Sequence, residues 1–185
     1  MTRLAHILAA TSLLVLAAGA AQAQTAPQQL TFQGDAPAGC LMQAPLSPSS
    51  DNASVTSAAP GSADIVIGQL VGDDAVSVGA TVVLSVPAAC NQAHTVSLVS
   101  VNGGLANADG TAASAPFRSI LPYSVAVSWG SDAETYQSGD PATTISYGDA
   151  ATGSVTVTIE IPAGGAPLVA GSYSDQLILE LAAAG

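Results

Sequence analysis

The chain has 185 residues, of which 49% are hydrophobic and only 8% are charged. Two basic residues, Arg3 and Arg118, stand against 13 acidic ones, and the chain contains no lysine. This balance argues against binding to nucleic acid or to anionic membrane surfaces, because both need basic side chains. Uncharged Ser, Thr, Asn, Gln, Ala and Gly must then cover much of the surface, which favours an exported β protein over a cytosolic enzyme.

The first 23 residues have the pattern of a secretory signal peptide. Arg3 supplies a positive start, an apolar stretch follows over residues 4–18, and residues 21–23 (Ala-Gln-Ala) match the A-x-A cleavage site. The apolar stretch is short for a membrane span, and no later segment is long and apolar enough to insert into a membrane. We expect export through the inner membrane and a mature chain of 162 residues (185 less 23), enough for one domain with a hydrophobic core.

Residues 24–38 form an N-terminal extension, and we expect a single domain over residues 39–185. Cys40 and Cys90 lie in this domain, and in an oxidising compartment two cysteines are expected to form a disulfide. The bond closes a loop of about 50 residues and contributes roughly 4 kcal/mol on the chain-entropy model. The alternative, a metal-binding or catalytic thiol, lacks the further ligands that it needs, so we predict no metal site and no cofactor.

Apolar and polar residues alternate along the mature chain with the period of a β-strand, and the helical period is absent. In chain order, the alternating runs are residues 65–67, 82–86, 96–101, 123–129, 144–147, 155–161 and 173–181. Turn signals separate the runs, among them residues 72–74, Pro87, residues 102–104 and residues 130–132. Residues 45–63 are rich in Ser, Ala and Pro and predict a low-complexity loop, and residues 103–116 predict a second. The pattern indicates an all-β fold, an antiparallel β-sandwich.

The last alternating run needs a neighbouring strand that the chain does not supply after it. Its apolar face carries Tyr173, Leu177, Leu179 and Leu181, and only four residues follow. We therefore expect this strand to border an acceptor groove for a strand from another polypeptide. The candidate donor is the extension, with Leu30 and Phe32 as its main apolar residues and with Ala26, Gly34 and Ala36 in phase. The alternative is an ordinary frayed N-terminus.

Several single residues have structural interpretations that outweigh functional ones. We expect Trp129 to pack in or at the edge of the core, and Tyr173 to form a tyrosine corner, in which the phenol bonds to nearby backbone. Arg118 is expected to pair with a carboxylate such as Asp175. His94 is expected in an exposed turn. No catalytic residues are predicted, because the chain lacks a nucleophile motif.

Six short segments, in order along the mature chain, together resemble the spore coat protein U domain. They are Gly39-Cys40, Val86-Pro-Ala-Ala-Cys90, Phe117-Arg118, Leu121-Pro-Tyr123, Trp129-Gly130 and Ala170-Gly-Ser-Tyr173-Ser-Asp175. The family includes subunits of archaic chaperone–usher pili. The donor segment departs from the family pattern at Gly34 and Ala36, where larger residues are usual.

The resemblance implies an immunoglobulin-like sandwich that is incomplete because its final strand is missing. A periplasmic chaperone fills the gap first, and the N-terminal extension of the next subunit then replaces it. Like or related pilin subunits join head-to-tail, and an outer-membrane usher delivers the fibre to the cell surface. The expected function is that of a non-enzymatic structural subunit. The alternative is a self-contained secreted or coat-type β-sandwich that does not polymerise.

Overall fold

The computed structural model describes residues 31–184 of the chain. The chain divides between Asp35 and Ala36 into two units, and every strand in the described residues belongs to the second unit. In the first unit, the described residues 31–35 form no strand and are exposed.

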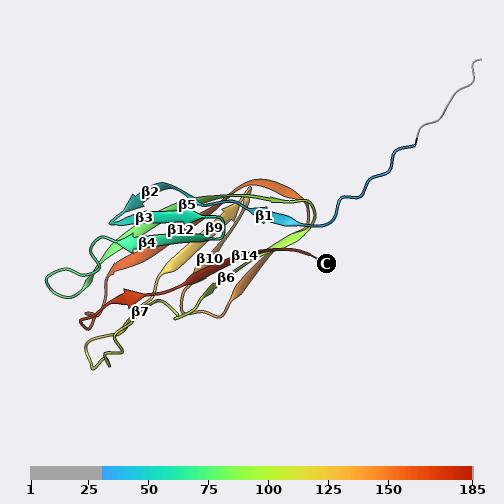
Figure 1. The fold of residues 1–185 in the computed structure, drawn as a ribbon. Coiled ribbons are helices and arrows are strands. Elements are labelled where there is room, and N and C mark those ends of the chain that lie inside the picture. The colour runs from blue at the N-terminus through green and yellow to red at the C-terminus, as the bar shows by residue number, and fades with distance from the viewer. Residues whose placement is uncertain (1–30, 185) are drawn as a thin grey trace, which may run out of the picture. The chain divides into compact units, whose positions relative to one another are not determined.

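All regular secondary structure of the described residues is β-strand, and the strands pair in antiparallel ladders (Figure 1). This confirms the predicted all-β fold. The strands are β1 (Cys40–Met42), β2 (Leu46–Asp51), β3 (Ala53–Ala59), β4 (Ser62–Ile67), β5 (Ser77–Cys90), β6 (His94–Ser100), β7 (Leu105–Asn107), β8 (Ile120–Leu121), β9 (Ser124–Trp129), β10 (Asp132–Gln137), β11 (Thr143–Tyr147), β12 (Ala151–Gly164), β13 (Tyr173–Ser174) and β14 (Leu177–Ala183).

The largest sheet has the strand order β1-β5-β12-β9-β10, with β2 also paired to β5. Because β12 pairs with β5 along nearly its whole length, β1 and β2 take successive stretches of the other edge of β5. A second sheet has the order β11-β6-β14, a small third sheet has the order β13-β7-β8, and β3 and β4 form a separate hairpin.

The second sheet and the β3–β4 hairpin cover the same face of the large sheet. Inward side chains of all three belong to one core, in which alternate residues of each strand are buried. The centre of this core is the set Val82, Leu84, Val86, Val96, Leu98, Val125, Val127, Val155 and Val157. The apolar faces predicted for these strands are therefore confirmed, and the architecture is that of a β-sandwich.

The predicted loop over residues 45–63 is wrong, because this segment forms β2, β3 and β4. The backbone of β2 pairs with the middle of β5, and Gly61, with a φ of 85°, makes the tight turn between β3 and β4. Asn52 joins β2 to β3 and anchors the hairpin: its Nδ2 donates to the carbonyl oxygens of Gln69 and Gly79, each at 2.6 Å. Small polar residues form strands here because distant segments supply the hydrogen-bond partners.

Two other turn predictions differ from the structure. Pro87 lies inside β5 rather than in a turn, and its carbonyl accepts a bond from the backbone N–H of Gln43 at 2.9 Å. The predicted loop over residues 103–116 contains the short strand β7. By contrast, Gly130 and Ser131 do form a tight turn, since Trp129 pairs directly with Asp132.

Candidate functional site

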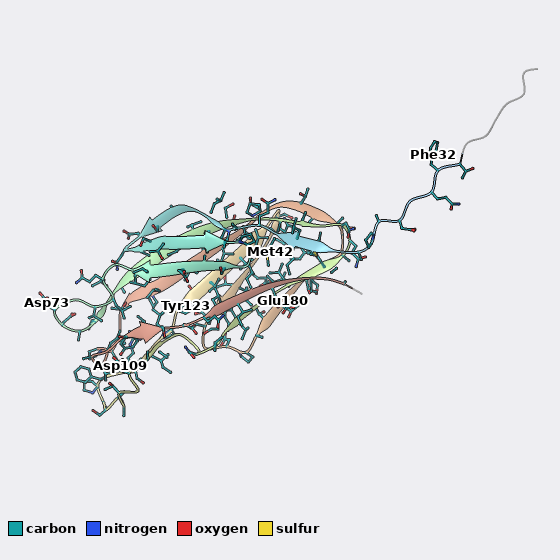
Figure 2. The ribbon with its side chains drawn as sticks, viewed as in Figure 1. Phe32, Met42, Asp73, Asp109, Tyr123 and Glu180 are labelled. Atoms are coloured by element: carbon teal, nitrogen blue, oxygen red, sulfur yellow. A yellow bond between two sulfur atoms is a disulfide. The ribbon has the colours of Figure 1, made fainter. Side chains whose placement is uncertain are left out.

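An apolar groove with a volume of about 570 Å³ lies over the inner face of the large sheet. Its floor is the row Ala80, Val82, Leu84 and Val86 of β5 together with Val157, Ile159 and Ile161 of β12. Leu177 and Leu179 of β14 form one wall, and Ile65 and Ile67 of β4 contribute to the opposite wall. Met42, labelled in Figure 2, and Gln43 also line the groove, at the end of β1.

The two strands that border the groove each have an edge without a partner strand in the described residues. β14 ends the second sheet and pairs only with β6, while β4 pairs only with β3. Such an edge presents a row of backbone N–H and C=O groups that another strand can pair with. A strand placed between β4 and β14 would join the hairpin and the second sheet into one continuous layer.

The wall side chains are less buried than the floor beneath them. Ile65, Ile67, Leu177 and Leu179 are each half-buried, whereas Val82 of the floor is only 2% exposed. The residues between them face the opposite way, and Ile178 is 41% exposed on the far side of β14. Alternate side chains of both strands therefore leave apolar surface open toward the groove, which an inserted strand would bury.

One part of the groove is polar and is built around Asp175. Its carboxylate accepts hydrogen bonds from the Tyr123 hydroxyl at 2.7 Å, the backbone N–H of Asn102 at 2.9 Å and the hydroxyl of Ser100. Burial, and then the hydrogen bond to Asp175, raise the pKa of Tyr123 well above its ordinary value. The raised pKa means that the phenol keeps its proton, and its role as a donor to Asp175, to a higher pH than a free tyrosine would.

The predicted strand over residues 173–181 is divided in two at Asp175. Leu177 and Leu179 line the groove as the sequence indicated, but Tyr173 and Leu181 do not. Tyr173 lies on β13, which pairs with β7, and its hydroxyl donates to the carbonyl of Val169 at 2.8 Å. This bond to the residue four positions earlier confirms the tyrosine corner. Leu181 lies further along β14, opposite Val96 of β6.

The predicted ion pair between Arg118 and Asp175 is wrong. Arg118 donates from a guanidinium nitrogen to the carbonyl of Gly164 at 3.1 Å, and its backbone bridges to Leu168. Asp175 has its oxygens occupied by uncharged donors instead. Arg118 lies just before β8 and bonds the end of β12, whereas Asp175 lies between β13 and β14.

His94 is not in an exposed turn, as predicted, but begins β6 and is 1% exposed. Its ring stacks on that of Tyr147 with the centroids 4.9 Å apart, and it lies 4.7 Å from the ring of Trp129. Its position on the inward face of β6 explains the burial. Trp129 is 5% exposed, as expected for a core residue.

The predicted disulfide between Cys40 and Cys90 is confirmed, with an S–S distance of 2.00 Å. The two residues are also directly opposite each other in the β1–β5 ladder. The bond therefore fixes β1, which has only three residues, against the end of β5. Since Met42 ends β1, the disulfide also holds this part of the groove lining.

The predicted donor residues are described only in part. Leu30 lies outside the described residues, and Phe32 belongs to the first unit, where its side chain is 91% exposed. The donor role of both residues stays a prediction.

Sequence reasoning missed the contribution of β4 and of Met42 to the groove. The alternation of Ile65 and Ile67 did predict a strand, but no local signal indicated which strands it would face. That arrangement depends on pairing between segments far apart in the chain.

Within residues 31–184, no group of three or more His, Cys, Asp and Glu side chains is placed to hold a metal ion. No helix in that range is long and apolar enough to cross a membrane. The chain matched no model of a protein family, no curated protein and no solved structure.

Proposed function

We propose that the protein is a structural subunit of a surface fibre and that it assembles by accepting a β-strand from another polypeptide. The observation that carries the proposal is the apolar groove between the open edges of β4 and β14. In this proposal the fold is an immunoglobulin-like sandwich that lacks one strand, in line with the resemblance to the spore coat protein U domain.

The groove has the two features that recognition by strand addition requires. Unpaired backbone groups on both borders supply hydrogen bonds, and these provide affinity. Half-buried apolar side chains at alternate positions, such as Leu177 and Leu179, supply contacts for every second residue of the guest strand, and these define its register.

A subunit that gives a strand from its N-terminal extension and receives one in its groove has two different contact surfaces. Such head-to-tail contacts produce open filaments rather than closed rings. We propose Leu30 and Phe32 as the residues that enter the groove of a like or related subunit. Export by the N-terminal signal, a periplasmic chaperone, an outer-membrane usher and a location at the cell surface belong to the same proposal, and no catalytic role does.

The test is to supply the missing strand within one chain. Residues 24–38 are appended after Gly185 through a flexible Gly/Ser linker, and thermal unfolding is compared with that of the unmodified protein. Burial of Leu30 and Phe32 and the new backbone hydrogen bonds along β4 and β14 act against the entropy of ordering the strand. Each net kcal/mol gained raises the melting temperature by about 2–4 °C, so we expect a measurable rise.

The matched control is the same appended strand with Leu30→Asp and Phe32→Asp, which retains the length and the linker but removes the apolar side chains. We expect no rise for this control. If the original strand also leaves the melting temperature unchanged, the groove does not accept it in this setting. A self-contained sandwich that does not polymerise then becomes the better interpretation of the buried core.

A further inference from the structure

We infer that Asn102 is a site of spontaneous covalent modification, at which the folded protein converts asparagine to aspartate and isoaspartate by deamidation. The co-reactant is water, and no enzyme takes part. Asn102 lies in the bend between the end of β6 and the start of β7. The inference does not depend on the proposed function, because the reaction needs no second polypeptide.

The residue that follows Asn102 favours the reaction. Deamidation begins when the backbone nitrogen of the next residue attacks the side-chain amide carbon, and the Cβ of that next residue hinders the attack. Asn102 is followed by glycine, which has no Cβ. The chain has three other asparagines, and each is followed by a residue with a Cβ: Asn52 by alanine, Asn91 by glutamine and Asn107 by alanine. The sequence therefore singles out Asn102 as the most labile of the four.

The structure leaves both reacting groups of this site accessible. Asn102 is exposed, and within residues 31–184 the backbone N–H of Gly103 donates no hydrogen bond. Asn107 shows the contrast, because the backbone N–H that would attack it, that of Ala108, donates to the carbonyl of Ser172 at 2.7 Å. The attacking nitrogen is therefore free at Asn102 and engaged at Asn107.

The reaction is balanced with water alone. The nitrogen of Gly103 forms a bond to Cγ of Asn102 and gives up its proton, the bond from Cγ to Nδ2 breaks, and ammonia leaves. The product is a five-membered succinimide ring. Water then opens the ring at either of its two carbonyl carbons. Breaking the bond from Cγ to the Gly103 nitrogen gives aspartate, whereas breaking the original peptide bond gives isoaspartate, in which the main chain runs through the side-chain carbons.

Both products disturb the hydrogen bonds around Asp175. Asn102 donates from its backbone N–H to Asp175 at 2.9 Å and from Nδ2 to the carbonyl of Ser174 at 3.2 Å. A carboxylate in place of the amide cannot donate to that carbonyl, and it repels the carboxylate of Asp175. Isoaspartate also lengthens the main chain before Gly103, whose carbonyl accepts from the Ser138 hydroxyl at 3.2 Å. Modification should therefore weaken the attachment of this bend to the break between β13 and β14.

The test follows all four asparagines in the same sample. The folded protein is incubated at physiological temperature in mildly alkaline buffer made with water labelled with heavy oxygen. Aliquots are digested with pepsin at acid pH, where deamidation is slow, and the peptides are sequenced by electron-transfer mass spectrometry. We expect both aspartate and isoaspartate at residue 102, each carrying the heavy oxygen. The other three asparagines are the internal controls and should stay largely unchanged over the same period.

Two variants separate the chemistry from general ageing of the sample. Asn102→Gln keeps an amide but would require a six-membered ring, which forms far more slowly. Gly103→Ala keeps the asparagine and adds the hindering Cβ; the nearest atoms to that Cβ lie 3.9 Å away, although the φ of 74° costs some stability. Both variants should keep the amide at residue 102 while the wild-type protein loses it.

Urea unfolding, followed by the fluorescence of Trp129, measures the consequence for the fold. The incubated wild-type protein should unfold at a lower urea concentration than a fresh sample, whereas incubated and fresh Asn102→Gln should unfold at the same concentration. If residue 102 stays intact, or is converted no faster than the other asparagines, the inference is overturned. If it is converted and the unfolding midpoint does not change, the predicted effect on the Asp175 hydrogen bonds is overturned.

Discussion

Removal of the Cys40–Cys90 disulfide tests how far this fold depends on a single covalent link. The bond joins residues 50 positions apart, and for a loop of that size the chain-entropy model assigns a stabilisation of about 4 kcal/mol. For a domain of this length each kcal/mol corresponds to about 2–4 °C, so Cys40→Ala with Cys90→Ala should lower the melting temperature by about 8–16 °C.

The loss should not be spread evenly over the molecule. Without the bond, the three residues of β1 are held by their ladder to β5 and by Asn91, whose side chain bonds the backbone of Gly39 at 2.8 Å and Pro37 at 2.6 Å. We therefore expect β1 to open before the rest of the sandwich. Hydrogen exchange should show faster exchange in β1 of the double variant under conditions in which β12 stays protected.

The assay is urea unfolding followed by the fluorescence of Trp129, the only tryptophan in the chain and a buried one. Wild-type protein in the presence of a reductant is the control, because it keeps both sulfur atoms and lacks only the bond. Both samples should lose a similar free energy of unfolding. A loss of free energy below about 1 kcal/mol in both the double variant and the reduced protein would refute the reasoning. It would mean that the disulfide does not restrict the conformations of the unfolded chain as the model assumes.

The remaining predictions concern Tyr123 and Asn52. The folded protein holds the pKa of Tyr123 above its ordinary value of 10.0, so above about pH 10 the unfolded chain loses this proton while the folded protein retains it. The free energy of unfolding should therefore fall as the pH rises, by up to about 1.4 kcal/mol per pH unit. Tyr123→Phe should make this fall less steep in urea unfolding measured from about pH 9 to 11. If the variant shows the same pH dependence as the wild-type protein, Tyr123 is not the group responsible. Asn52→Ala should cost about 3 kcal/mol in urea unfolding, because it removes three side-chain hydrogen bonds and places alanine at a φ of 50°. Asn52→Gly should recover the part due to backbone strain alone, and a loss below about 1 kcal/mol for alanine would count against the anchoring role.

Local alternation was enough to predict the long central strands. The runs at Val82–Val86, Tyr123–Trp129 and Val155–Ile161 lie within or largely within β5, β9 and β12, because a half-buried strand must show one apolar and one polar face. The disulfide was predictable for a different reason, since the signal-peptide pattern predicts an oxidising compartment and two cysteines have one pairing available. One wall of the groove, Leu177 and Leu179, followed from the same alternation.

The tertiary structure decided the features that depend on partners far away in the chain. Residues 46–63 are rich in Ser, Ala and Pro and show no clear alternation, and they form strands because β5 and Asn52 supply hydrogen bonds that no local window contains. His94 is buried because β6 turns that residue inward. The opposite wall of the groove comes from β4, which lies across the groove from β14 because the hairpin packs on the large sheet. The alternation of apolar and polar residues along one strand is a local property, so the sequence alone reveals it. Which strand edges pair and which stay open depends on segments far apart in the chain, so only the tertiary structure decides it.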